Sequence, residues 1–286
     1  MIRFIIAAAV VALLTPMAAK LFASRMIVAV PSELRWHQGA VIPRSGGIAI
    51  YLAVIFIALP IPWQWQVALT MFFLAGLRDD VKPLSILGKL ISQGVAAVIA
   101  VTSLVVLPGE LLLGVIAVIW IAFFVNAYNM LDNMDGTAAA TAFVISLTLA
   151  LLAWDVNNDP ANILAASLAG AMLGFFFYNA SPASVFLGDN GSHLIGAALA
   201  IIALSLWHQI GATIMIAFAI PIIDFFYVTL KRIAAGRKPY VGGRDHLAHD
   251  LHRRGFSTRQ IAVFYLLANA ICGFVAWTVV ALNGRR

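Results

Sequence analysis

The chain has 286 residues; 63% are hydrophobic and only 10% are charged, with 18 basic and 12 acidic side chains. Soluble domains carry about 25% charged residues, so this composition excludes a water-soluble protein and predicts an all-α integral membrane protein. The single cysteine, Cys272, excludes disulfides and thiolate metal sites, and we expect no nucleic-acid partner. No linker or internal repeat divides the sequence, so we expect one polytopic domain, residues 1–286.

Apolar stretches suited to membrane helices follow one another along the chain. A helix needs roughly 20 apolar residues to cross a bilayer. Ten stretches meet or approach that length, namely 2–24, 46–60, 62–78, 86–107, 110–127, 137–154, 161–179, 192–207, 210–231 and 259–282. The first looks like a signal peptide because Arg3 precedes it, but its long run without a clear small-residue cleavage site favours an uncleaved helix.

The basic residues are distributed unequally between the two sets of loops. Ten helices place both termini on one side, where the loops and ends hold only Arg3, Arg285 and Arg286. The opposite loops hold nearly all other lysines and arginines, so the positive-inside rule makes them cytoplasmic and leaves both termini outside. Most acids and histidines gather on the cytoplasmic side too. We therefore predict the active site on that face of a multi-pass plasma (inner) membrane protein.

Polar stretches adjoin the second and third helices. The stretch "RWHQGAVIPRSGG" includes Arg44, and its glycines let the backbone approach a ligand closely, although helix packing alone would explain them. In "LAGLRDDVKPLSILGKL", Asp79 and Asp80 end a helix. Adjacent carboxylates repel near a membrane, and a cation or basic partners such as Lys82 and Lys89 would relieve the cost. A solvated loop with capping aspartates explains this spacing equally well.

Carboxylates and carboxamides recur in "NAYNMLDNMDG". Asn126, Asn129, Asp132 and Asp135 are spaced by three, so each step turns about 300° around a helix and the four spread across half of a helix end. Mg²⁺ prefers an oxygen shell with one or two carboxylates plus substrate phosphates. A helix cap closed by Gly136 would need one such residue rather than four. The pattern therefore favours a metal and phosphate site.

Two further stretches carry polar groups at helix ends. Asp189 in "FLGDNGSHLIG" precedes an apolar helix, and taken alone it favours a helix cap over an anion site. In "VGGRDHLAHDLHRRGFS", His246, His249 and His252 lie among arginines that include Arg244. This positive charge favours an anionic ligand over zinc. A basic loop held at anionic membrane lipids is the alternative.

These five stretches, in this order, resemble the motifs of the polyprenyl-phosphate N-acetylhexosamine-1-phosphate transferases, glycosyltransferase family 4, which includes phospho-N-acetylmuramoyl-pentapeptide-transferase. The matching segments are "PRSGG", Asp79-Asp80, "NAYNMLDNMDGTAA", "FLGDNGS" and "RDHLAHDL". The chain departs from the family pattern in "DDVKP", which lacks a third acid, and at Asn133, where Gly is usual. The last loop lacks the histidine-rich signature of the muramoyl-pentapeptide enzyme, which favours the branch that uses simple UDP-N-acetylhexosamines.

The resemblance implies a Mg²⁺-dependent enzyme, with Mn²⁺ as a substitute, in the first membrane step of cell-envelope polysaccharide synthesis. It would transfer N-acetylhexosamine 1-phosphate, with N-acetylglucosamine favoured, from a UDP-sugar to undecaprenyl or another polyprenyl phosphate and release UMP. Membrane lipids are expected partners, and a homodimer is compatible with the sequence. Phospho-N-acetylmuramoyl-pentapeptide transfer is the alternative reaction. A transporter is disfavoured because the acids lie at helix ends on one side rather than at the bilayer midplane.

The resemblance also implies roles for individual residues. Asp79 and Asp80 would be catalytic, with Asp79 orienting or deprotonating the lipid phosphate, and a route through an aspartyl-phosphate stays open. Metal binding would fall to Asp80, Asp189 and Asp132. The expected substrate-binding residues are Arg44, Lys89, Asn126, Asn129, Asp132, Asp135, Arg244, Asp245, His246 and His249.

Overall fold

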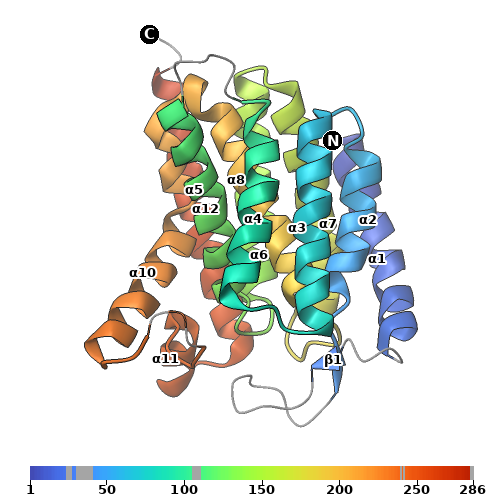
Figure 1. Ribbon diagram of the computed structural model, residues 1–286, viewed down its shortest axis with the longest axis vertical. Coiled ribbons are helices and arrows are strands. Elements are labelled where there is room, and N and C mark those ends of the chain that lie inside the picture. Colours follow the sequence, from blue (N-terminus) through green and yellow to red (C-terminus); the bar gives the residue numbers. More distant parts are fainter. Residues whose placement is uncertain (24–27, 30–40, 105–110, 239, 241, 284–286) are drawn as a thin grey trace.

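The computed structural model describes residues 1–23, 28–29, 41–104, 111–238, 240 and 242–283 (Figure 1). The first part of the "RWHQGAVIPRSGG" stretch, residues 35–40, lies outside the described residues. The elements are α1 (Ile2–Ala23), β1 (Val28–Ala29), β2 (Ile42–Pro43), α2 (Gly46–Ile57), α3 (Trp63–Val81), α4 (Ile86–Val101), α5 (Leu111–Leu131), α6 (Thr137–Asp155), α7 (Asp159–Asn179), α8 (Gly188–Ile210), η1 (Gly211–Thr213), α9 (Ile214–Ala217), α10 (Ala219–Ala234), α11 (Leu247–Arg253) and α12 (Thr258–Asn283). The two short strands pair antiparallel.

The fold is an all-α membrane protein, as the composition predicted. Among the described residues, six segments are long and apolar enough to cross a membrane: α1, α5, α6, α7, α8 together with α9, and α12. The apolar helices α2 and α4 are shorter, and α3 ends in the charged run Arg78, Asp79 and Asp80. Ten membrane crossings therefore remain a prediction.

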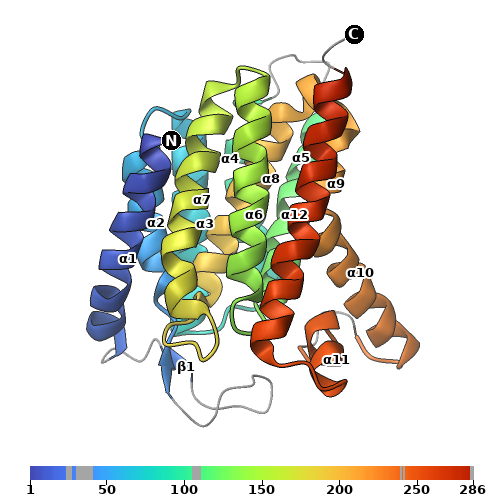
Figure 2. The ribbon, with the colours of Figure 1, turned by 180° about the vertical axis from the view of Figure 1, so that it is seen from behind.

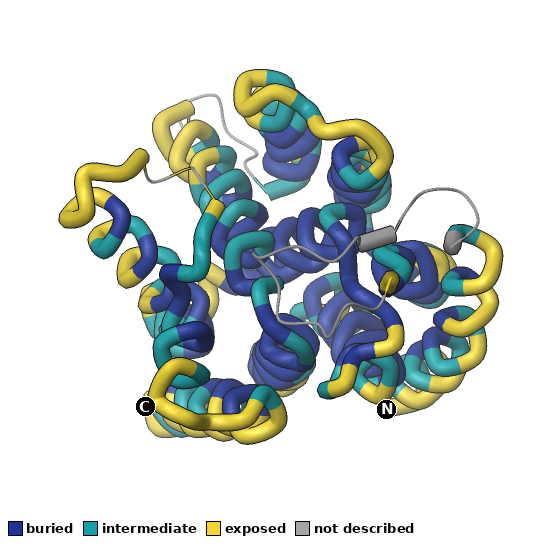
Figure 3. The backbone as a smooth tube through the Cα atoms, turned by 90° about the horizontal axis from the view of Figure 1, so that it is seen from below, coloured by how far each residue is buried: buried dark blue, intermediate teal, exposed yellow. Residues whose placement is uncertain are grey.

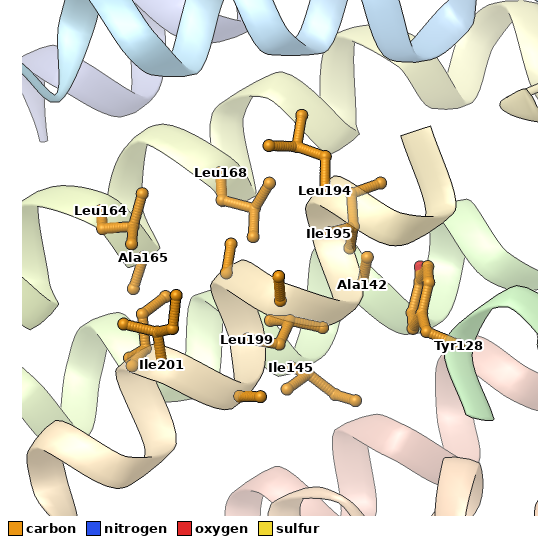
Figure 4. Packing of buried hydrophobic residues seen from close by; sticks show 14 of the residues in the cluster. Tyr128, Ala142, Ile145, Leu164, Ala165, Leu168, Leu194, Ile195, Leu199 and Ile201 are labelled. Atoms are coloured by element: carbon orange, nitrogen blue, oxygen red, sulfur yellow. The ribbon is translucent and has the colours of Figure 1, made fainter. Parts of the chain in front are cut away.

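Helix α8 lies at the centre of the bundle. Nearly every residue from Gly188 to Ala203 is buried, because α3, α5, α2, α6 and α7 all pack against this helix. Figure 4 shows Leu194, Ile195 and Leu199 of α8 packed among side chains of α6 and α7. Seen from below, the buried parts of the chain gather in the middle of the bundle and the exposed parts form its rim (Figure 3). The first turn of α8 is thereby fixed by its neighbours.

Two glycines bring α2 and α3 against the first turn of α8. A Cβ on Gly47 would lie 2.0 Å from the Oδ1 atom of Asn190, and one on Gly76 would lie 2.2 Å from the carbonyl oxygen of Asp189. No side chain fits at either position without moving backbone. The glycines of the "PRSGG" stretch therefore serve helix packing, which positions the loop ends next to the Asp189 motif.

Helices α1 to α8 run in alternate directions, so the loops between them fall into two sets. Helix α1 begins and α12 ends at the upper end of the bundle in Figures 1 and 2. The C-terminal end of α3, the N-terminal end of α8, and α11 lie at the opposite end. The residues singled out in the sequence thus share one end of the molecule, away from both termini. Which end faces the cytoplasm remains a prediction.

The ninth expected helix, 210–231, was wrong as a single element. The chain forms α8, η1, α9 and α10 over this region instead. Gly211 has a φ of 54°, a left-handed conformation that glycine adopts without strain and that ends α8. Pro221 lies in the first turn of α10, where its missing N–H costs nothing. Helix α10 then leans away from the bundle, next to α11 (Figures 1 and 2).

Candidate active site

Asp80 holds the N-terminal end of α8. Its Oδ1 atom accepts a hydrogen bond from the backbone N–H of Asp189 at 3.0 Å, and its Oδ2 atom accepts one from that of Asn190 at 2.9 Å. The side-chain amide of Asn190 donates a third, at 2.6 Å to Oδ2. The Asp80 side chain is fully buried, with the Arg44 guanidinium 3.9 Å away. We expected Asp80 to meet a metal directly; its oxygens instead face the α8 backbone, as an N-cap residue's would.

Asp79, Lys89 and Asp189 form a charged cluster beside this cap. One Asp79 oxygen accepts a hydrogen bond from the Leu84 N–H at 2.6 Å, and the other forms an ion pair with Lys89. The Lys89 Nζ atom also lies 3.6 Å from the Asp189 Oδ2 atom, so the two carboxyl groups lie beside the same ammonium group. Like charges so close repel, and the ammonium group offsets part of that cost. The cluster therefore suits a further cation.

The asparagine-aspartate stretch does not lie on one helix, because α5 ends at Leu131. Asn126 donates to the buried Gln93 side chain at 2.8 Å, which ties α5 to α4. The Asn129 amide lies 3.3 Å from Nε2 of His193, a residue one turn beyond Asp189 on α8. The expectation that all four residues share a helix end was wrong.

Asp135 and Asp132, which both follow the end of α5, have different surroundings. The Oδ2 atom of Asp135 accepts a hydrogen bond from the Ala183 N–H at 3.0 Å, so Asp135 holds the connection between α7 and α8. Asp132, directly after α5, instead lines the cavity described below. The end of the helix thus separates two acids that looked equivalent in the sequence.

The C-terminal loop is anchored by acids. Asp245 accepts hydrogen bonds from Arg232 at 3.1 Å and from Arg237 at 2.6 Å. Partial burial acts to raise the pKa of Asp245, but the two guanidinium groups outweigh it and hold the pKa below its usual range. His246 precedes α11, and its Nδ1 atom lies 2.9 Å from an oxygen of Asp224 on α10. These contacts fix the loop against α10.

His249 lies beside His246, with the ring centroids 5.9 Å apart. It is buried, and its Nδ1 atom has no hydrogen-bond partner among the described residues. Burial, reinforced by the neighbouring His246 and nearby arginines, lowers the pKa of His249 to about 4. The ring is therefore neutral at pH 7, with one nitrogen available to a ligand.

A cavity of about 700 Å³ joins these groups at the lower end of the bundle. Its wall comes from α4, α5, α10, the loop before α11 and α11 itself. Of the residues expected from the sequence, it is lined by Lys89, Asn126, Asn129, Asp132, His246 and His249. Its apolar lining is Leu84, Ile86, Leu90, Met130 and Phe225. A volume of roughly 300–1,000 Å³ is usual for a small-molecule site.

The other expected residues lie outside the cavity lining. Arg44, Asp79, Asp80, Asp135, Asp189, Arg244 and Asp245 are in that group. Lys89 connects the two sets, because it lines the cavity and also contacts Asp79 and Asp189. No three His, Cys, Asp or Glu side chains converge on a common metal position within the described ranges.

Sequence reasoning missed Asp224, Gln93, His193 and Arg232 as members of this site. Each is a buried polar residue that contacts a predicted one. A charged residue within an apolar membrane segment is a functional hypothesis by default, so Asp224 in "PIIDFFYV" could have been found. The role of His193 depends on a contact across 64 positions that spacing does not reveal.

Comparison with known proteins identifies the family. Residues 63–207, just over half of the chain, match the model of glycosyl transferase family 4. The chain belongs to this family. The matched range includes the Asp79-Asp80 pair, the asparagine-aspartate stretch and Asp189, and the resemblance expected from the motifs is confirmed.

Individual family members match along most of their length. A probable undecaprenyl-phosphate N-acetylglucosaminyl 1-phosphate transferase of Bacillus subtilis is 29% identical, over 93% of this chain and 81% of that protein. The phospho-N-acetylmuramoyl-pentapeptide-transferase of Enterococcus hirae is 30% identical, over 84% of this chain and 85% of that protein. An undecaprenyl-phosphate alpha-N-acetylglucosaminyl 1-phosphate transferase of Salmonella typhi is 27% identical, over 87% and 75%.

Proposed function

We propose that this enzyme transfers N-acetylglucosamine 1-phosphate from UDP-N-acetylglucosamine to a polyprenyl phosphate, releases UMP and leaves a polyprenyl-diphospho-sugar in the membrane. The cavity carries this proposal, since it joins a cation, carboxamides and histidines to an apolar wall on α4 and α10. A lipid phosphate and a nucleotide sugar need such a combination. The relatives named for N-acetylglucosaminyl 1-phosphate transfer support the same reaction.

The reaction requires that the two substrates be positioned and that their negative charges be offset, and it has little need of a general base. A lipid phosphate oxygen attacks the β-phosphorus of the donor, and both partners are anionic. A phosphate monoester is already largely dianionic at pH 7, because its second pKa is about 6. Lys89, held by Asp79, would bring positive charge to the reacting phosphates, and His249 would offer its free nitrogen. Asp79 then acts by orienting Lys89 and the lipid phosphate.

A divalent cation, Mg²⁺ or Mn²⁺, fits the donors present beside the cavity. Asp189 would hold it with Asn129 and Asp132, which supply the carboxylate and carboxamide oxygens that Mg²⁺ prefers. When bound, the ion would offset phosphate charge and polarise the phosphoryl group. The placement of the Asp79 and Asp189 carboxyl groups beside one Lys89 ammonium group supports this assignment, because a cation would offset the second negative charge. Asp80 would act behind the metal, by holding the first α8 turn.

The proposed orientation places this end of the bundle in the cytoplasm and both termini outside, within a single domain. The alternating helix directions and the basic residues at the ends of α3, α10 and α11 support it. UDP-sugars are cytoplasmic substrates in this scheme, and the acceptor reaches the site from the inner leaflet of the plasma membrane.

Incubating the purified protein with undecaprenyl phosphate, Mg²⁺ and one UDP-sugar at a time tests the proposal. We expect UMP release with UDP-N-acetylglucosamine. Release only with the UDP-N-acetylmuramoyl-pentapeptide would assign the enzyme to lipid I synthesis instead. Absence of UMP with every donor, in protein that unfolds cooperatively on heating, would overturn the reaction.

A further inference from the structure

Asp224 is a buried acid without a part in the mechanism above. It lies in α10 between apolar neighbours, with 1% of its surface exposed. Burying a carboxylate is costly unless hydrogen bonds replace the water that it loses. Asp224 does not line the cavity. Its contacts therefore indicate what it does.

Those contacts join three helices. One oxygen of Asp224 lies 2.9 Å from Nδ1 of His246, at the start of α11. The other accepts a hydrogen bond from the Leu247 N–H at 3.1 Å, and the Tyr265 hydroxyl of α12 lies 3.5 Å from it. Asp224 is thus the point where the loop carrying His246 meets α10 and α12.

The geometry determines which nitrogen of His246 can serve a ligand. A carboxylate at Nδ1 accepts the proton of that nitrogen, and this fixes the ring orientation and the tautomer. His246 lines the cavity, and with Nδ1 taken by Asp224 the nitrogen left for a ligand is Nε2. In the protonated ring Nε2 also donates, and Asp224 balances the charge while an anion accepts.

We propose that Asp224 is a positioning residue that directs Nε2 of His246 at the diphosphate of a nucleoside diphosphate-linked donor. The proposal rests on the proposed function and deepens it, because it assigns this side of the cavity to the donor rather than the lipid. Lys89 and the apolar residues of α4 lie on another part of the wall. The Asp224–His246 pair thus selects the anionic part of the soluble substrate.

Asp250 offers a matched control at the same helix junction. It lies on α11 and bonds Lys231 of α10 at 2.6 Å, with further contacts to Tyr227 and Arg253. It therefore also ties α11 to α10. Its bond to His246 runs from the Asp250 backbone N–H to the His246 carbonyl at 3.1 Å, and a side-chain substitution keeps that bond. If Asp224 only docked the loop, the two aspartates would behave alike on substitution.

Binding of UDP to the purified protein, followed by calorimetry, is the first measurement. Asp224→Asn should weaken UDP binding by at least about tenfold, the effect of losing one charge-assisted hydrogen bond. The KM for the UDP-sugar should rise similarly while the KM for the lipid stays within about twofold. Asp250→Asn should leave both close to wild type. Equal effects of the two substitutions would overturn the proposal.

Two further measurements keep the test decisive. His246→Gln should weaken UDP binding as Asp224→Asn does. The double variant should bind UDP no more weakly than His246→Gln alone, because each substitution disrupts the same Asp224–His246 pair. Additive losses would contradict the pairing. In unmutated protein labelled with ¹⁵N-histidine, the His246 signal, assigned by its loss in His246→Gln, should show a protonated Nδ1. A bare Nδ1 would overturn the proposal even if Asp224→Asn did not fold.

The readouts separate this proposal from the reaction itself. If no UDP-sugar gives UMP but UDP binding still depends on Asp224 and His246, the reaction fails and the positioning role stands. If UMP is released and neither UDP binding nor the donor KM responds to Asp224→Asn, the positioning role fails alone.

Discussion

Replacing Asp80 with Asn tests whether this one carboxylate holds the N-terminal end of α8 in place. The Asp80 oxygens accept hydrogen bonds from the Asp189 and Asn190 N–H groups and from the Asn190 side chain. Asn keeps one acceptor and turns an NH₂ group toward those donors. Hydrogen bonds to charged groups contribute about 1.5–3 kcal/mol, and loss of a helix cap costs about 0.5–2 kcal/mol, so we expect a total loss of about 2–5 kcal/mol.

Thermal unfolding in detergent, followed by tryptophan fluorescence, measures this loss as a fall of several degrees in the midpoint. Asp189→Asn is the control, because it removes one of the two carboxylates that lie beside the single Lys89 ammonium group and keeps the backbone N–H that Asp80 binds. We expect its midpoint to stay or rise while turnover falls by at least about a hundredfold, as for loss of a major electrostatic group. An unchanged midpoint for Asp80→Asn with turnover abolished would refute the capping role and return Asp80 to the metal.

Three further predictions concern other parts of the molecule. In a Cys272→Ala background, a cysteine that replaces exposed Ser257 should react with a thiol reagent only from the cytoplasm, and one that replaces exposed Asp159 only from outside. The reverse pattern in intact cells would invert the topology. Because the pKa of His249 is lowered to about 4, its contribution to stability is present above pH 6.5 and lost as pH falls toward 4. His249→Gln should therefore reduce the drop in unfolding midpoint between pH 7 and pH 5, and an unaltered drop would exclude a buried neutral ring. His249→Ala should raise the KM for the UDP-sugar more than the KM for the lipid. The His252 ring bonds the Phe256 carbonyl and does not line the cavity, so His252→Ala should leave both KM values close to wild type. A larger effect of His252→Ala than of His249→Ala would overturn the assignment.

The helices were largely predictable because a long apolar run has few alternatives in a membrane. The break after α8 was expected at 208–209, close to Gly211, but the division of 210–231 into η1, α9 and α10 was missed because the average hydropathy of this stretch stays high. Hydropathy reports whether a segment enters the apolar phase and says little about where its backbone bends. The extension of α5 to Leu131 was missed for a related reason, since polar residues at its end lowered the apolar signal.

The site was predictable as a set of residues and less so as a set of roles. The resemblance of the five polar stretches to the family motifs, rather than spacing alone, placed Asp79, Asp80 and Asp189 near a common chemistry. It could not show that Asp80 turns toward the α8 backbone, because the contact spans 109 positions and follows from packing around Gly76. Asp135 was likewise grouped with Asp132 by spacing, and the end of α5 separates them.

Transfer of a labelled phosphorus tests the central claim most directly. UDP-N-acetylglucosamine carrying ³²P at the β-position, incubated with undecaprenyl phosphate and Mg²⁺, should pass its label to the lipid fraction and leave unlabelled UMP. The label must stay absent from the lipid with Asp189→Asn, which serves as the background. Label that remains in UDP while the sugar moves to the lipid would show glycosyl transfer at carbon, and would contradict phosphosugar transfer by this enzyme.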